Sequence, residues 1–145
     1  MAGQLILALA ILVSLHEWGH YIAARSFGIR VEKFYIFFDA WGVKLLSKQI
    51  GETEWGIGWL PLGGYVKISG MIDESMDTEQ MSQPAQPWEF RAKPTWQRLV
   101  IMLGGVTVNL VLGFLIYMMV MYVWGNRVIN NDDSIYGLAP SPKVE

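Results

Sequence analysis

The sequence predicts an α-helical membrane protein: two transmembrane helices linked by a cytoplasmic segment that contains a membrane-re-entrant β-hairpin. Three observations predict this fold class. Hydrophobic residues make up 52% of the 145 residues and charged residues only 17%, against about 25% charged in a soluble domain. Two long stretches are almost free of charge, and a segment of alternating aromatic residues and glycines lies between them. The length allows one modest domain.

Composition also excludes several classes of protein. The sequence has no cysteine, which excludes a disulfide framework and any cysteine-ligated zinc or iron–sulfur site. The formal net charge is −2, so we expect no nucleic-acid partner.

The longer apolar stretch predicts a transmembrane helix over residues 97–125. No charged residue lies between Arg98 and Arg127, and the run from Leu99 to Trp124 is almost wholly apolar. A helix needs about 20 such residues to cross the bilayer core. A buried helix of a soluble protein is a poor explanation for a run of this length.

The first 25 residues predict the other transmembrane helix, in which Glu17 is the one charged residue before Arg25. A secretory signal peptide is the alternative. It would have a basic start and a short apolar stretch that ends at a cleavage site. This sequence starts without Lys or Arg, and its apolar pattern continues through His16 and His20. A retained helix is therefore favoured.

The basic residues predict the orientation. Nine of the eleven Lys and Arg residues lie from Arg25 to Arg98, at the facing ends of the two helices or between them, and only Arg127 and Lys143 lie elsewhere. By the positive-inside rule the connecting segment faces the cytoplasm and both termini face the other side.

The connecting segment divides into two parts. Residues 26–70 predict β structure: a strand over Val31–Phe38, then a hairpin over Glu54–Ile68 with a tight turn at Gly63-Gly64. Its bulky apolar residues suggest that the hairpin dips into the bilayer, where protein or water must form hydrogen bonds with its backbone N–H and C=O groups. Residues 71–96 predict a polar surface loop. Beyond the second helix, residues 126–145 predict the start of a polar extramembrane region.

The strongest motif is His16-Glu17-Trp18-Gly19-His20. On an α-helix the two histidines lie about 40° apart around the axis and one turn apart along it, so both imidazoles can reach one metal ion at about 2 Å. Glu17 lies beside that ion, about 100° from His16 and 60° from His20. A carboxylate there can take a proton from a metal-bound water, as in zinc hydrolases.

The membrane context makes this motif more specific than it is in a soluble protein. Burial of Glu17 in a membrane helix costs on the order of 3 kcal/mol, and such residues are functional by default. His16 and His20 are the only histidines in the sequence. Two imidazoles and a water favour Zn²⁺. Catalytic zinc takes three protein ligands, and the candidates Asp39, Glu52 and Glu54 would reach the site only if the connection folds back. We expect the third ligand in a longer form of the protein.

Two further places on the chain are candidates for substrate contact. In the second helix, Gly105 and Asn109 are four residues apart and share a face that Gly113 continues. Asn109 either holds the helices together or donates a hydrogen bond to the substrate or the developing oxyanion. The turn at Gly63-Gly64 is either a plain turn or a wall of the active-site cavity, with a strand edge that pairs with an extended substrate.

Three ordered segments resemble the site-2 protease family of intramembrane zinc metalloproteases: HEWGHYIAARSFGIRVEKFYIFF, GWLPLGGYVKISG and RAKPTWQRLVIMLGGVTVNLVLGFLIY. The resemblance implies that His16 and His20 are zinc ligands and that Glu17 is the catalytic glutamate. It implies a membrane-re-entrant β-loop with Gly63, Gly64 and Tyr65 at its turn. The proline that usually precedes the asparagine of the second helix is absent here, although Asn109 is present.

The resemblance also implies the activity and the setting. The full-length protein would be a multi-pass protein of the bacterial inner membrane with its amino terminus in the periplasm. It would cut transmembrane segments of single-pass membrane proteins, such as anti-sigma factors or remnant signal peptides. The family's third zinc ligand, an Asp in a late Leu-Asp-Gly motif, has no match in this sequence, and neither does its periplasmic PDZ domain. This chain alone would not form a complete active site.

Two alternatives stay open at the level of sequence. One is another class of membrane HExxH zinc peptidase, which would need a downstream Glu ligand. The other is a metal-binding membrane module without catalytic activity. The substrate, its cleavage site and the oligomeric state are not indicated by the sequence.

Overall fold

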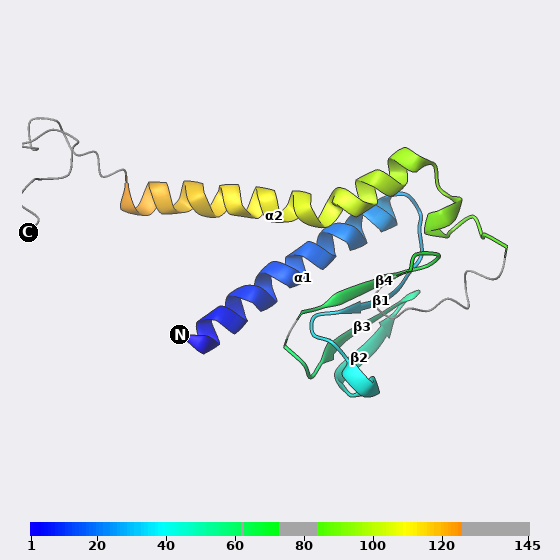
Figure 1. The fold of residues 1–145 in the computed structure, drawn as a ribbon, viewed down its shortest axis with the longest axis horizontal. Helices are drawn as coiled ribbons and strands as arrows, with labels where there is room; N and C mark the ends of the chain where they lie inside the picture. Colours follow the sequence, from blue (N-terminus) through cyan, green and yellow to red (C-terminus); the bar gives the residue numbers. More distant parts are fainter. Residues whose placement is uncertain (62, 73–83, 126–145) are drawn as a thin grey trace, which may run out of the picture. The chain divides into compact units, whose positions relative to one another are not determined.

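A computed structural model of the chain describes residues 1–61, 63–72 and 84–125. It contains two long helices, α1 (Ala2–Ser26) and α2 (Thr95–Trp124), with a four-stranded sheet between them in sequence (Figure 1). The strands are β1 (Val31–Tyr35), β2 (Lys44–Ile50), β3 (Thr53–Gly58) and β4 (Tyr65–Ile68). Short 3-10 helices cover Ala40–Gly42 and Phe90–Ala92. Residues Met1–Leu112 form one compact unit, and the last part of α2 belongs to a second unit, Gly113–Glu145.

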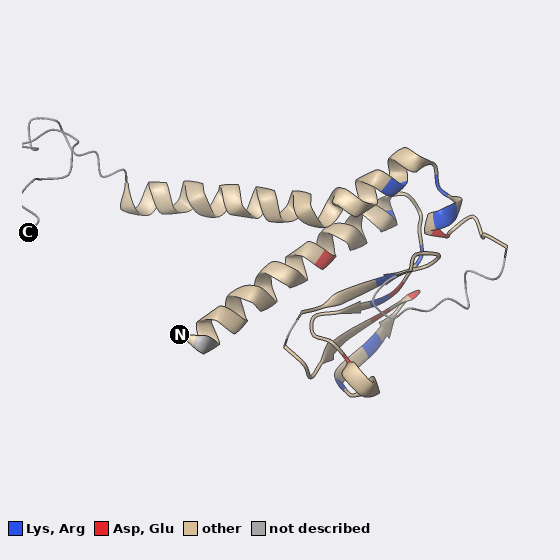
Figure 2. Ribbon diagram, in the orientation of Figure 1, with Lys and Arg blue, Asp and Glu red and all other residues tan. Residues whose placement is uncertain are grey.

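Both helices are long and apolar enough to cross a membrane. Their bounds differ by one or two residues from the predicted ranges 1–25 and 97–125. Most of their large side chains are exposed, including Leu5 at 62% and Leu110 at 73%, whereas the apolar side of a soluble core helix is buried. In Figure 2 the charged residues gather on the sheet and on the segments next to it, and α2 carries charge only near its start.

α1 ends where glycine permits a left-handed backbone. Gly28 has φ +66°, and its N–H donates to the carbonyl of Arg25 while the N–H of Ile29 donates to the carbonyl of Ala24. These two bonds form a Schellman motif, which satisfies the last carbonyls of the helix and turns the chain back. Ile29 is fully buried, so the chain leaves α1 directly into the core and then into β1.

The sheet has the strand order β2-β3-β1-β4. β1 is central: it pairs in parallel with β3 and antiparallel with β4. The predicted hairpin over Glu54–Ile68 is therefore wrong in its pairing, because β3 and β4 lie on opposite sides of β1. The physical reason is the burial of β1, in which Val31, Phe34 and Tyr35 are buried and the two charged residues between them are half-buried. A strand of that kind is favoured in the middle of a sheet.

The hairpin of this sheet is formed by β2 and β3 instead. Ile50 pairs with Thr53 across a turn of two residues, and Gly51 takes φ +64° there, which glycine adopts without a steric cost. Every residue of β2 is exposed. A fully exposed strand with two lysines lacks the buried apolar face that identifies a strand in sequence, and for this reason β2 was not predicted.

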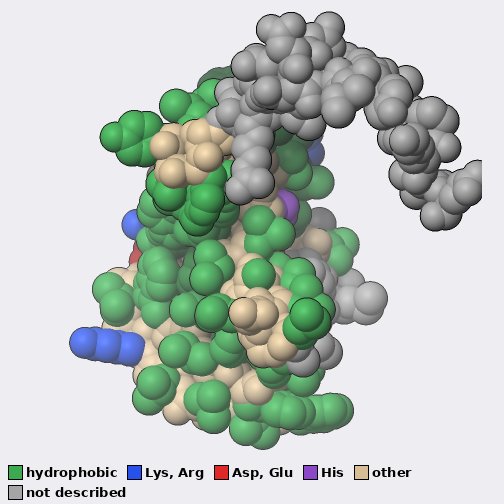
Figure 3. Space-filling view, turned by 90° about the vertical axis from the view of Figure 1, so that its left-hand side faces the viewer, with side chains coloured by type: hydrophobic (Ala, Val, Ile, Leu, Met, Phe, Trp, Pro, Cys, Tyr) green, Lys and Arg blue, Asp and Glu red, His purple; other side chains and the backbone are tan. Residues whose placement is uncertain are grey.

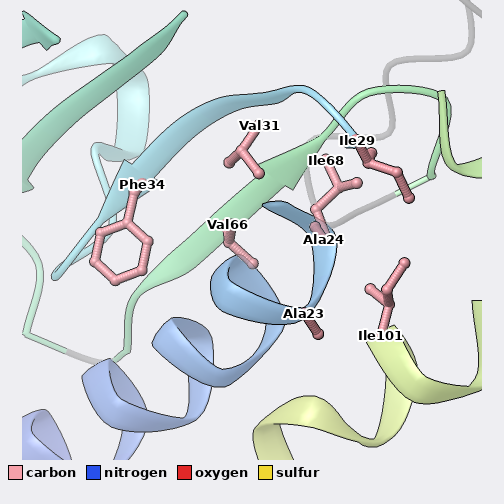
Figure 4. Packing of buried hydrophobic residues seen from close by; sticks show 8 residues of the cluster. All are labelled: Ala23, Ala24, Ile29, Val31, Phe34, Val66, Ile68 and Ile101. Carbon is pink, nitrogen blue, oxygen red and sulfur yellow. The ribbon is translucent and has the colours of Figure 1, made fainter. Parts of the chain in front are cut away.

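The core lies where the sheet covers the last turns of α1. Figure 4 shows its eight residues: Ala23 and Ala24 of α1, side chains of β1 and β4, and Ile101 of α2 beside Ile29. Only the ends of the predicted polar loop 71–96 are described; residues 73–83, like the predicted extramembrane region 126–145, lie outside the described residues.

Candidate metal centre

His16 and His20 lie one turn apart on α1 and converge at their outer ring nitrogens. Nε2 of His16 is 3.2 Å from Nε2 of His20, and the two ring planes meet at 79°. Both side chains are half-buried. Figure 3 shows a histidine at the surface among hydrophobic side chains. The predicted pairing of the two imidazoles is thus present in the structure.

Three groups of α2 contact these histidines. The carboxamide nitrogen Nδ2 of Asn109 is 3.2 Å from Nδ1 of His16. The backbone carbonyl of Ile101 is 2.7 Å from Nδ1 of His20. Gly105 is buried between them, and a Cβ atom at Gly105 would lie 2.6 Å from Nε2 of each histidine. Because glycine has no side chain, position 105 leaves open the space next to both Nε2 atoms.

A pair of glycines permits this close approach of α1 and α2. A Cβ atom at Gly19 would overlap the carbonyl of Gly104, and a Cβ atom at Gly104 would lie 2.7 Å from the carbonyl oxygen of Gly19. Small residues at a helix crossing let the backbones come together. As a result, the histidine side chains of α1 lie within direct contact of groups on α2.

Glu17 lies on the side of α1 that turns from α2 toward the sheet. Tyr21, four residues later and so on the same side of the helix, packs against Trp55 of β3 with ring centroids 5.0 Å apart. Glu17 itself is half-buried. The role of Glu17 beside the histidines stays a prediction.

The two histidines fit a zinc ion. Ligands at 2.0–2.1 Å in tetrahedral geometry have nitrogen atoms about 3.3 Å apart, close to the 3.2 Å between the two Nε2 atoms. Within residues 1–61, 63–72 and 84–125, no group of three His, Cys, Asp or Glu side chains is positioned to hold a metal ion. His16 and His20 thus supply two ligands of a site whose third is not found among the described residues.

The three carboxylates considered as a third ligand are all engaged in the sheet region. Asp39 accepts a hydrogen bond from the Tyr65 hydroxyl at 3.0 Å. Glu52 pairs with Arg25 at 3.2 Å. Glu54 pairs with Lys44 at 2.6 Å. The connection therefore does not fold back to bring any of them to the histidines.

The predicted turn residues lie at the start of β4. Gly63 is buried near α1: a Cβ atom there would lie 3.8 Å from Cγ1 of Val13, which is one turn before His16. A Cβ atom at Gly64 would overlap the carbonyl oxygen of Tyr35 on β1. Tyr65 is the first residue of β4 rather than part of a turn. Close backbone contact with β1, and not hairpin formation, is what requires glycine at position 64.

Comparison with known proteins shows to which family the chain belongs. The model of Peptidase family M50 matches residues 4–140. The chain belongs to peptidase family M50, the site-2 proteases. The resemblance inferred from the three sequence segments is thereby confirmed.

Relatives of this M50 chain are proteases by name, and some are named zinc metalloproteases. The regulator of sigma E protease of Haemophilus influenzae is 38% identical over 125 residues, 85% of this chain and 26% of the relative. Zinc metalloprotease Rip1 of Mycolicibacterium smegmatis is 32% identical over 127 residues, 85% of this chain and 30% of the relative. The chain therefore spans less than a third of the length of these relatives.

Two contacts of the M50 centre could not be found from sequence. The carbonyl of Ile101 contacts His20 through the backbone, which leaves no trace in residue type. Gly105 was placed by the sequence only on the face that it shares with Asn109, and in the structure it also leaves the space between the histidines. The sequence feature that could have indicated this contact is the position of Gly105 on the same helical face as Asn109.

Proposed function

We propose that the full-length protein is an intramembrane zinc metalloprotease and that this chain forms the first half of its catalytic core. The observation that carries the proposal is the pair of Nε2 atoms 3.2 Å apart beside a glycine with no side chain to fill the space. Membership of family M50 supports the same conclusion. We expect the third zinc ligand in a region that corresponds to the length of the relatives outside the matched residues.

The chemistry divides between the metal and Glu17. When bound, Zn²⁺ polarises the scissile carbonyl and lowers the pKa of a water ligand. The Glu17 carboxylate accepts a proton from the attacking water as the new C–O bond forms. It then passes the proton to the amide nitrogen as the C–N bond breaks. His16 and His20 would hold the metal through Nε2.

A bacterial inner membrane is the proposed setting. Exposed apolar side chains along α1 and α2 support bilayer contact, and the excess of Lys and Arg between the helices supports a cytoplasmic position for the sheet. The amino terminus would then be periplasmic. Single-pass membrane proteins, for example anti-sigma factors or remnant signal peptides, are the proposed substrates.

The edge strand β4 is the proposed contact for an extended substrate. β4 ends the sheet on the side of β1 away from β3, and Gly63 places its start near α1, one turn before His16. An edge strand can bind an extended peptide by adding it to the sheet. A substrate segment on β4 would run beside the helix that carries Glu17.

Substitution of Glu17 tests the enzymatic proposal. In the full-length protein, Glu17→Gln should abolish cleavage of a transmembrane substrate and leave the zinc content unchanged, because glutamine cannot accept the proton. His16→Ala should lower the zinc content, measured by atomic emission. Gly113→Ala is the control, since none of the described residues lies within 4 Å of a Cβ atom there. Full cleavage by Glu17→Gln would contradict the proposed role of Glu17, and no cleavage by the unsubstituted full-length protein would favour a non-catalytic module.

Disulfide cross-linking tests the contact with β4. A Lys67→Cys variant should cross-link to single cysteines at alternate positions of the substrate, because side chains of paired strands alternate between faces. Lys48→Cys on β2, the opposite edge of the sheet, is the matched control. The absence of cysteine from this sequence limits background thiols. Equal cross-linking at Lys48→Cys, or a period of three to four residues, would contradict strand addition.

A further inference from the structure

A cavity of about 550 Å³ lies on the face of the sheet that turns away from α1. Val66 of β4 belongs to the core together with Ala23 of α1, and neighbouring residues of a strand point to opposite faces. Tyr65, which lines the cavity, therefore points away from α1. The volume lies within the range of about 300–1,000 Å³ that is typical of ligand pockets.

Aromatic rings of Phe38, Trp41 and Tyr65 form walls of this cavity. The ring of Tyr65 stacks on that of Phe38, with centroids 6.0 Å apart and planes 10° apart. Trp41 lies in the connection between β1 and β2 and stacks on Trp59 at 5.7 Å, and Nε1 of Trp59 donates to the carbonyl of Ala40 at 3.0 Å. These contacts hold the rings in place, so the cavity is preformed for another aromatic ring.

One carboxylate lies among these rings. Asp39 lines the cavity, and its Oδ1 accepts a hydrogen bond from the Tyr65 hydroxyl at 3.0 Å. A carboxylate can accept about four hydrogen bonds, so this bond leaves acceptor sites for a further donor. Lys33 also lines the cavity, and its positive charge balances that of Asp39. The lining therefore favours a neutral ring that carries an N–H or O–H donor over a cation.

This cavity lies on the same side of the sheet as side chains that a substrate on β4 would present. Residues directly opposite each other in paired strands have their side chains on one face. The substrate residue opposite Tyr65 would therefore place its side chain on the face that holds the cavity. Tyr and Trp combine a ring with a donor, and both are enriched near the ends of transmembrane segments, the substrate class proposed above.

We infer that the cavity is a specificity pocket for a Tyr or Trp side chain of the substrate, whose O–H or N–H donates to the Asp39 carboxylate. The inference rests on the proposed protease function and on the proposed contact of the substrate with β4. It assigns Asp39 to substrate selection and not to the metal.

A series of substrates tests the pocket in the full-length protein in detergent. The measured quantity is kcat/KM for model single-pass substrates that carry Tyr, Phe or Leu at each of six consecutive positions around the cleaved bond. At one of these positions Tyr should be favoured over Phe about 10-fold, as expected for a hydrogen bond to a charged acceptor. Asp39→Ala should bring the ratio of Tyr to Phe close to one. This ratio cancels any general loss of activity in the variant.

Tyr65→Phe is the matched control. Like Asp39→Ala, it removes the hydrogen bond between positions 65 and 39, but it keeps the carboxylate, so the preference for Tyr should persist. Trp41→Ala provides a second test, since the Trp41 side chain is 87% exposed and its loss should leave the fold intact. It should lower kcat/KM for the Tyr substrate several-fold and leave that for the Leu substrate unchanged.

Two classes of outcome would contradict the inference. Equal kcat/KM for Tyr and Phe at every position in the native protein, or a native ratio in Asp39→Ala, would overturn it. So would an unchanged ratio of Tyr to Leu in Trp41→Ala, or a stronger preference for Lys than for Tyr at the same position. Failure of the native protein to cleave any substrate would instead overturn the proposed protease function, so the two failures are distinguishable.

Discussion

Gly105 is buried where α2 meets the two histidines, and the absence of a side chain there defines the space between them. A Cβ atom would lie 2.6 Å from Nε2 of both His16 and His20. We expect Gly105→Ala to weaken Zn²⁺ binding by at least about 10-fold, as displacement of a supported ligand does. Alanine is about 1 kcal/mol more favourable than glycine inside an α-helix. The substitution should therefore stabilise α2, and a weaker helix cannot explain a loss of Zn²⁺ affinity. Chelator competition provides the measurement.

The control for this substitution is Gly113→Ala on the same helix. Both changes add one methyl group to α2, but a Cβ atom at Gly113 lies more than 4 Å from its neighbours in the part of the chain that the structure describes. Only Gly105→Ala should alter the affinity for Zn²⁺. Equal affinities in the two variants would mean that the metal does not occupy the space beside Gly105.

At the level of the sheet, three strands are tied by one polar cluster. Glu54 of β3 accepts from Lys44 of β2 at 2.6 Å and from the Tyr35 hydroxyl of β1 at 2.8 Å. The hydrogen bond from Lys44, followed by that from Tyr35, lowers the pKa of Glu54 below its ordinary 4.5. The hydrogen bond that Lys44 donates to Glu54 raises the pKa of Lys44 above its ordinary 10.5. The ionised pair thus favours the folded sheet.

The depressed pKa of Glu54 sets the sign of a pH dependence. A carboxyl whose pKa is lower in the folded state stabilises that state above its unfolded pKa, and the stabilisation is lost as the pH falls through the folded value. The sheet should therefore lose stability below about pH 4.5, measured by near-ultraviolet circular dichroism. Glu54→Gln should flatten this acid transition. Glu52→Gln should leave it unchanged, because the pair of Glu52 with Arg25 is exposed. An unaltered transition in Glu54→Gln would contradict this role.

On the scale of the whole molecule, the distribution of charge predicts how the chain lies in a membrane. We expect a Lys48→Cys variant to react with a membrane-impermeant maleimide in inverted vesicles and not in intact spheroplasts, because β2 lies in the basic connection. Gln4→Cys, near the start of α1, should react in the opposite pattern. Labelling of Lys48→Cys in intact spheroplasts would contradict the proposed orientation.

Much of this architecture could be predicted because it depends on local pattern. The two long helices follow from uninterrupted apolar runs, and the juxtaposition of His16 and His20 follows from the 3.6-residue repeat of a helix. The pairing of the strands could not be predicted in the same way. β1 lies between β3 and β4, and strand order depends on which apolar faces meet in space.

The sequence by itself determined the helices, the histidine pair with Glu17 beside it, and membership of family M50, because each depends on residues near one another along the chain. Only the tertiary structure decided what surrounds the histidines. Gly105, the carbonyl of Ile101 and the carboxamide of Asn109 come from more than 80 positions away, where the glycine contact between α1 and α2 brings them. Contacts of that kind arise from packing between distant segments, which local residue patterns do not encode.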